Sequence, residues 1–203
     1  MTSRRDREKE FKRQLIAEAA HKLLSGSSFE AVTVEDIARE AEFGKGTLYL
    51  YFESKEEILI YIFSHGVETL CKDIEAQCSQ EPDVREALNR YMSLQYGFYQ
   101  KYHSIFLSLL RRKLEGSLNP EQFTGAMRHQ DTITDLVSAI LDRGIREKFI
   151  VATDSHKLAR VIRNVLKGFS FEALDRKDMD VEKELELIKM VLSYGIAAGG
   201  REQ

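Results

Sequence analysis

This sequence contains few of the residues that interrupt helices or cross-link chains. Of its 203 residues only two are proline and none is tryptophan, and cysteine occurs only at Cys71 and Cys78. The low proline content suits a chain built from helices. The two cysteines fall on one predicted helix about 10 Å apart along its axis, which is too far for a disulfide. We therefore expect buried, unreactive thiols.

Long apolar runs are also missing. No stretch approaches the ~20 residues of a membrane span. The N-terminus, Met1 to Lys9, carries positive charge but has no apolar segment behind it, unlike a secretory signal. We therefore expect a cytoplasmic protein with no membrane partner. The composition, 43% hydrophobic and 31% charged, is ordinary for a globular protein.

The sequence also lacks the common signatures of catalysis and of cofactor binding. The segment Gly44-Lys45-Gly46-Thr47 has no glycine five residues before its Gly-Lys, as a phosphate-binding loop requires, and no dinucleotide-binding glycine pattern occurs. There is no Gly-x-Ser-x-Gly elbow. The histidines do not have metal-ligand spacing; they are His21, His65, His103, His129 and His156. We expect no enzyme activity, no cofactor and no metal site.

Apolar residues recur at helical spacing along the whole chain, which predicts an all-α fold of about nine helices. The predicted helices cover residues 8–25, two short helices from Thr33 and from Lys45, and then 54–78, 83–101, 103–114, 120–148, 155–174 and 180–198, the last ending at Gly199-Gly200. The first three form a head whose predicted core is Phe11, Leu15, Ile37, Leu48 and Phe52. The expected domains are residues 1–53 and 54–203.

The segment from Thr33 to Glu57 carries the most informative pattern. Thr33 followed by Asp36 predicts a helix N-cap, and Gly44 suits a turn or a cap that has no side chain. Leu48 and Phe52 lie four residues apart and face inward. Ser54 with Glu57 forms a capping box that starts a new helix. Two short helices joined by a tight turn predict a helix-turn-helix.

These residues resemble the DNA-binding motif of the tetracycline-repressor (TetR) family. The resemblance covers residues 11 to 60 and rests on Thr33-x-x-x-Ile37-Ala38, Lys45-Gly46-Thr47-Leu48-Tyr49-x-Tyr51-Phe52 and Ser54-Lys55-Glu56. Two positions depart from the common pattern: Glu42 stands where a glycine is frequent, and Gly44 where a serine often caps the recognition helix.

The resemblance implies a role for each matching residue. Thr33, Tyr49 and Lys55 would hold phosphates. Lys45, Thr47 and Tyr51 would face the floor of the major groove, where Gly46 allows close approach of the backbone. The family also implies a homodimer on double-stranded, palindromic operator DNA.

Charge alone does not indicate DNA binding. The net charge is −3, and residues 1–55 hold ten basic and ten acidic side chains. The first thirteen residues carry six basic against three acidic side chains, a surplus of +3. This segment, which includes Arg4 and Arg5, is either a solvated terminus or an arm that neutralises phosphates beside the recognition helix.

The larger C-terminal region is predicted to sense a small-molecule effector. Its aromatic residues exceed what one helical stripe buries, so they form either a filled core or a largely apolar pocket. The predicted lining is Phe63, Val67, Tyr96, Tyr99, Tyr102, His103, Phe106 and Arg111. His103 is alternatively a structural or surface histidine, and Arg111, with the two basic residues after it, a solvated patch.

The last two helices are apolar over more than one face, which favours a dimer interface over a monomer surface. The predicted interface residues are Val165, Phe169, Phe171, Leu187 and Val191. Together these features predict a ligand-responsive, DNA-binding regulator, most simply a repressor that its effector releases. The alternative is a dimeric helical adaptor without specific DNA binding.

Overall fold

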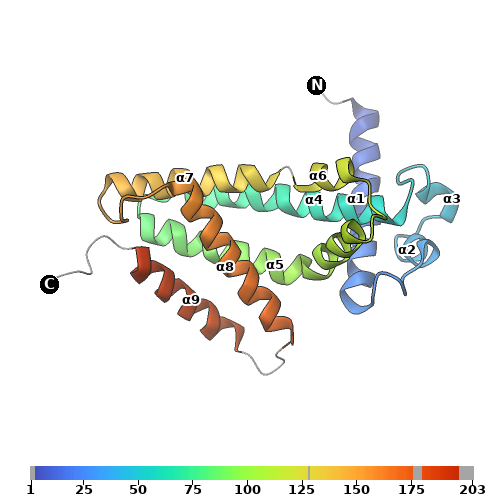
Figure 1. The fold of residues 1–203 in the computed structure, drawn as a ribbon. Coiled ribbons are helices and arrows are strands. Elements are labelled where there is room, and N and C mark those ends of the chain that lie inside the picture. The colour runs from blue at the N-terminus through green and yellow to red at the C-terminus, as the bar shows by residue number, and fades with distance from the viewer. Residues whose placement is uncertain (1–2, 128, 176–179, 197–203) are drawn as a thin grey trace. The chain divides into compact units, whose positions relative to one another are not determined.

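The computed structural model describes residues 3–127, 129–175 and 180–196. Within these ranges the chain is helical and contains no β-strand, which confirms the predicted all-α class (Figure 1). The helices are α1 (Arg4–Gly26), α2 (Val34–Glu40), α3 (Lys45–Leu48), α4 (Lys55–Ile74), α5 (Val84–Leu114), α6 (Pro120–Met127), α7 (His129–Arg146), α8 (Ser155–Asp175) and α9 (Val181–Ile196). A π-helical turn, Glu75–Ser79, follows α4. None of the described helices meets the length and hydropathy needed to span a bilayer.

Side-chain caps fix most of the helix starts that the sequence predicts. Ser3 caps α1 in a reciprocal capping box with Asp6, so this helix starts four residues before its predicted start. Ser54 accepts from the Glu57 N–H at 3.1 Å, while the Glu57 carboxylate accepts from the Glu53 N–H at 2.7 Å. Asn119 caps α6 by accepting from the Glu121 N–H at 2.8 Å, and Asp154 caps α8 by accepting from the Lys157 N–H at 2.9 Å. Each cap satisfies a backbone donor that the helix leaves unpaired.

One predicted helix boundary is wrong. The predicted break at residue 102 does not exist, because α5 is one continuous helix of 31 residues. The helix predicted over 120–148 is described as α6, up to Met127, and α7, from His129; residue 128 between them lies outside the described residues. The predicted end at Gly199-Gly200 lies outside the described residues.

The chain forms two compact units. Unit 1 contains Met1–Gly66 and Tyr102–Met127, and unit 2 contains Val67–Lys101 and Arg128–Gln203. Helices α4 and α5 each have one end in either unit. The expected domain boundary after residue 53 falls inside unit 1 and stays a prediction.

The core of unit 1 is formed by α1, α2, α3 and parts of α4 and α5. Ile37, Leu48 and Phe52 are at most 1% exposed, as predicted. The predicted core positions of Phe11 and Leu15 are wrong, because these side chains are 59% and 36% exposed. The buried side of α1 instead carries Ile16, Ala20 and Leu24.

The core of unit 2 is formed by α7, α8 and the parts of α4 and α5 in this unit. Helix α8 packs on α7, and α9 runs back along α8 (Figure 1). The buried aromatic side chains include Tyr91, Tyr96, Phe98 and Tyr99. Gly144 of α7 allows the close packing of Ile150, because a Cβ at this position would lie 2.5 Å from its Cδ1 atom.

Candidate nucleic-acid interface

The helix-turn-helix begins with a fully formed cap at Thr33. The Thr33 hydroxyl accepts from the Asp36 N–H at 3.1 Å, and the Asp36 carboxylate accepts from the Thr33 N–H at 3.0 Å. The hydrogen bonds from Thr33 hold the pKa of Asp36 below its usual value. The carboxylate is therefore ionised at neutral pH and favours the positive N-terminal end of α2.

The turn between α2 and α3 contains a residue in an unusual backbone conformation. Glu42 has φ +60°, in the left-handed region that favours glycine. This conformation explains why glycine is frequent at the position. The Phe43 N–H then donates to the Ala38 carbonyl at 2.8 Å and closes the turn.

Helix α3 is a single short helix that presents polar side chains. Its N-cap is Gly44, which makes no side-chain cap, as the sequence predicts. Leu48 and Phe52 anchor the segment in the core, each at 1% exposure. On the other side Lys45, Gly46 and Tyr49 are exposed, while Thr47 and Tyr51 are half-buried. The predicted groove-facing residues Lys45, Thr47 and Tyr51 are thus all at least partly exposed.

Only part of the predicted reading segment is α-helical. Helix α3 ends at Leu48, and the chain continues in tight turns in which the Leu50 N–H donates to Thr47 and the Tyr51 N–H to Leu48. Tyr49 and Tyr51 therefore lie in these turns and not on a longer recognition helix. The Tyr51 ring lies 6.4 Å from that of Phe43.

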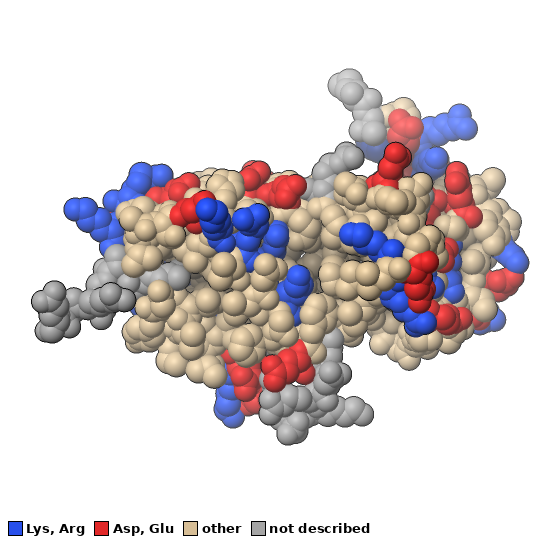
Figure 2. Space-filling model, viewed as in Figure 1, with Lys and Arg blue, Asp and Glu red and all other residues tan. Residues whose placement is uncertain are grey.

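Charges on this surface are largely paired within the protein. Lys45 forms an ion pair with Glu35, and Arg39 forms one with Asp36. Figure 2 shows acidic and basic side chains mixed over the face in view. The even charge balance of residues 1–55 thus has a structural counterpart, and DNA phosphates must compete with carboxylates for Lys45.

Two of the predicted phosphate contacts are already engaged inside unit 1. The Thr33 hydroxyl donates its proton to Asp36 at 2.6 Å. The Lys55 amine donates to the carbonyls of Phe29 and Val32 at 2.6 and 2.7 Å, which leaves it one free donor. Burial lowers the pKa of this amine. The roles of both residues at phosphates stay predictions.

The start of α1 lies beside the turn after α3. Arg4 and Arg5 are exposed. A surface hollow of about 660 Å³ is lined by Arg5, Asp6, Glu8, Lys9, Lys12, Leu50 and Tyr51. The Glu8 carboxylate, and after it the Tyr51 hydroxyl, raise the pKa of Lys12. The N-terminal basic residues are thus near the predicted DNA-reading segment.

The contacts that support the helix-turn-helix from outside it were not predicted from the sequence. The Arg13 guanidinium lies 4.4 Å from the centre of the Phe52 ring and 3.1 Å from the Glu57 carboxylate. The Phe29 ring has Lys55 3.9 Å and Arg112 3.5 Å from its centre. No local sequence signal identifies these contacts, because the partners are far apart in the chain.

Comparison with known proteins identifies this arrangement. Residues 16–62 match the family model described as bacterial regulatory proteins, tetR family. The HTH-type transcriptional regulator YhgD of Bacillus subtilis is 24% identical over 193 residues, 92% of this chain and 97% of its own. The TetR family regulator PfmR from Thermus thermophilus is 26% identical with a TM-score of 0.72, covering 88% of this chain and 97% of its own.

This chain belongs to the TetR family. It is a helix-turn-helix, DNA-binding transcriptional regulator. A further solved structure, of the regulator FadR from Bacillus subtilis in complex with stearoyl-CoA, is 21% identical with a TM-score of 0.73 and covers 90% of this chain and 98% of that one. At this identity the likeness concerns the fold.

In this TetR-family protein the predicted effector residues are divided between the two units. Unit 1 contains Phe63, Tyr102, His103, Phe106 and Arg111, and unit 2 contains Val67, Tyr96 and Tyr99. The Phe63 and Phe106 rings are 5.8 Å apart, and Tyr102 stacks on His21 at 5.0 Å. Arg111 pairs with Glu115 at 2.8 Å. The effector role of these residues stays a prediction.

Unit 2 buries polar groups beside its aromatic core. Gln95 is 0% exposed, and its Nε2 atom has no hydrogen-bond partner among the described residues. The Tyr91 hydroxyl donates to Gln95 Oε1 at 3.5 Å. Burial raises the pKa of Tyr99 to about 12, so its hydroxyl stays protonated at neutral pH. The buried Gln95 Nε2 atom is thus a hydrogen-bond donor without a described acceptor.

The predicted dimer residues lie on α8 and α9. Val165, Phe169 and Phe171 are half-buried, whereas Leu187 and Val191 are 47% and 59% exposed. Helix α9 also exposes Met190 and Tyr194. The exposed apolar positions suit the predicted interface, which stays a prediction.

The two cysteines are free and buried, as expected. Burial raises the pKa of both thiols, and that of Cys78 to about 11. A raised pKa keeps a thiol protonated and unreactive.

Proposed function

We propose that this regulator is a homodimeric repressor that an acyl-chain effector releases from a palindromic operator. The observation that carries the proposal is the outward surface of α3 and its following turns, where exposed Lys45 and Tyr49 are held by buried Leu48 and Phe52. A short helix with an apolar inner side and a polar outer side suits insertion into a major groove.

The proposed contacts follow from the position of each side chain. Tyr49, Arg4 and Arg5 are exposed and would hold phosphates, which fix register without reading sequence. Lys45 and Thr47 would contact base edges, and Tyr51 the groove beside them. A Cβ at Gly46 would meet no protein atom within 4 Å, so packing does not require glycine there. Its lack of a side chain would instead let the DNA approach the backbone closely.

The effector proposal rests on the chemistry of unit 2 and on a relative. Tyr91, Tyr96, Phe98 and Tyr99 supply a mainly apolar environment, and Gln95 adds a buried donor without a partner. The relative FadR from Bacillus subtilis was solved with stearoyl-CoA. We infer that the effector is likewise an apolar chain with a carbonyl group, which would accept from such a donor.

A gel-shift assay tests the DNA part of this proposal. The full-length protein is expected to retard the DNA upstream of its own gene, and footprinting should show two half-sites about 34 Å apart, one helical turn. A Lys45→Gln variant should rank a set of operator variants in a different order of affinity from the wild type. Equal retardation of operator and scrambled DNA by the wild type would contradict the proposal.

A further inference from the structure

The connection between α1 and α2 encloses a hollow with the C-terminal part of α5. Its volume is about 190 Å³, equivalent to about six water molecules at ~30 Å³ each. All of its lining residues belong to unit 1; they are Leu24, Ser27, Ser28, Phe29, Glu30, Ser104, Ile105, Leu107, Ser108, Arg111 and Arg112. The DNA-reading surface and the proposed acyl site of unit 2 do not use this hollow; of the residues predicted from sequence to line an effector pocket, it contains Arg111 alone.

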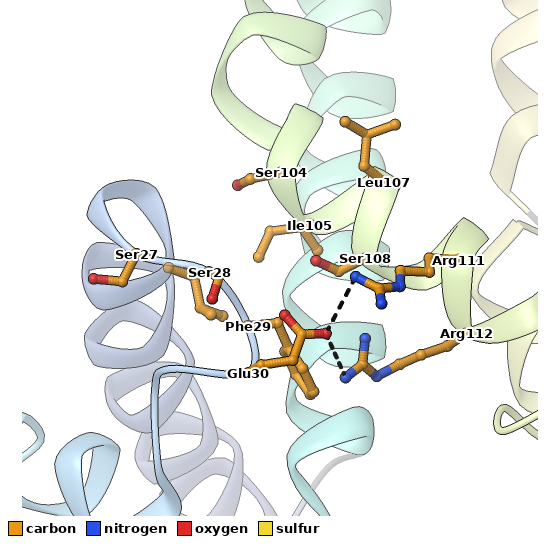
Figure 3. A pocket seen from close by; sticks show the side chains of 11 residues that line it. Ser27, Ser28, Phe29, Glu30, Ser104, Ile105, Leu107, Ser108, Arg111 and Arg112 are labelled. Atoms are coloured by element: carbon orange, nitrogen blue, oxygen red, sulfur yellow. Dashed lines mark ion pairs between the residues drawn. The ribbon is translucent and has the colours of Figure 1, made fainter. Parts of the chain in front are cut away.

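Helix α5 contributes a row of hydrogen-bond donors. Ser104, Ser108 and the two arginines Arg111 and Arg112 are spaced so that they share one side of the helix (Figure 3). The hydroxyls of Ser104 and Ser108 make no hydrogen bond to other described residues. Guanidinium and hydroxyl groups together suit an oxyanion with several acceptor oxygens.

A carboxylate of the protein occupies this position loosely. Glu30 lies between the two guanidiniums in Figure 3, at 3.8 Å from Arg111 and 3.5 Å from Arg112. These distances exceed the 2.7–2.9 Å that is usual for a charge-assisted hydrogen bond. Arg111 has a closer partner in Glu115, at 2.8 Å, and Arg112 in Glu56, at 3.3 Å.

Glu30 can leave without unfolding the connection. Its neighbour Phe29 is buried. Lys55 contacts both the ring and the carbonyl of Phe29, and Arg112 contacts the ring. The Glu30 side chain itself is 55% exposed. The carboxylate can therefore rotate into solvent while the backbone stays anchored.

We propose that this hollow is a binding site for a phosphoryl group, which replaces the Glu30 carboxylate between Arg111 and Arg112. Ser104 and Ser108 donate to its remaining oxygens, and Leu24, Ile105 and Leu107 cover a short organic part. The C-terminal end of α1 opposes an anion, since its last carbonyls carry partial negative charge. We therefore expect weak binding, with a Kd of about 1 mM.

Calorimetric titration of the full-length protein with inorganic phosphate tests the site, with chloride adjusted to hold ionic strength constant. Glu30→Gln removes the internal competitor and should tighten binding about fivefold, the upper range for an exposed ion pair. Glu18→Gln is the matched control, because it changes the net charge equally at an exposed position outside the hollow. It should leave the Kd unchanged.

Arg111→Gln should weaken binding about fivefold. Ser108→Ala does not alter charge and should weaken phosphate binding by less than Arg111→Gln. Glycerol 3-phosphate distinguishes the source of the group: tighter binding than phosphate indicates an organic ester, and equal binding indicates the free ion. Equal Kd values for Glu30→Gln and Glu18→Gln, or the absence of saturable binding by Glu30→Gln, would overturn the proposal.

Discussion

Replacing Tyr49 by phenylalanine isolates one predicted contact with DNA. The side chain is 46% exposed at the end of α3, where its backbone N–H donates to the Lys45 carbonyl at 3.3 Å. Its hydroxyl makes no hydrogen bond to the described residues. Tyr49→Phe therefore removes a single donor without changing the packing of the head.

The expected loss follows from one hydrogen bond in each of two heads. A net value of about 1–1.5 kcal/mol per bond gives about 2–3 kcal/mol for a dimer on its operator. This free energy corresponds to about a 30- to 150-fold increase in Kd. The loss should be the same on random duplex, because phosphate contacts carry no sequence information.

Fluorescence anisotropy with operator and scrambled duplexes at one fixed salt concentration measures both losses. Thermal unfolding is the control, and its midpoint should equal that of the wild type. Thr47→Val provides the contrast, since we expect it to change the ratio between the two duplexes. The assignment of Tyr49 to a phosphate would be wrong if Tyr49→Phe weakened binding to the operator duplex alone, or changed the affinity for neither duplex.

Three further variants test other parts of the account. Lys55→Met should lower the free energy of unfolding by about 1–3 kcal/mol, because it leaves the carbonyls of Phe29 and Val32 without their donor; unchanged chemical denaturation would contradict this. Glu42→Gly should raise that free energy by about 0.5–1 kcal/mol, the relief of a left-handed φ less the extra flexibility of glycine, and a decrease would refute it. Val191→Asp should produce monomers with weak operator binding, since the wild-type side chain is 59% exposed on one protomer and the change costs only the interface; sedimentation of this variant as a dimer would exclude Val191 from that interface.

The helix-turn-helix could be predicted from sequence because its determinants are local. Thr33 and Asp36 are three residues apart and form the predicted cap. Leu48 and Phe52 are four apart and are both buried. At Glu42 the residue departs from the common pattern but the backbone conformation does not, because its φ of +60° is one that glycine adopts easily.

Helix boundaries elsewhere were harder to predict. No proline occurs in α5, and this helix continues through the predicted break at residue 102. The stripe of Phe11 and Leu15 is apolar but is not the buried side of α1, because packing selected Ile16, Ala20 and Leu24. Periodicity identifies a helix but does not choose between adjacent stripes.

Contacts between distant residues could not be predicted at all. Lys55 reaches the Phe29 carbonyl across 26 positions, and Arg13 reaches Glu57 across 44. Glu30 and Arg112 are brought together only by the fold of unit 1. The sequence therefore predicts the DNA-reading residues and their local anchors, Leu48 and Phe52, but not the distant contacts around them.

The central claim, that an acyl-chain effector releases this repressor from DNA, is tested most directly by linkage. The affinity for stearoyl-CoA is measured with and without saturating operator duplex, and operator affinity with and without stearoyl-CoA; coenzyme A alone and scrambled duplex are the controls. We expect operator DNA to weaken stearoyl-CoA binding and stearoyl-CoA to weaken operator binding. Both should change by the same factor of about 5 to 150, a coupling of ~1–3 kcal/mol. If the two ligands bind without affecting each other, the effector is not a switch for DNA binding and the account is wrong.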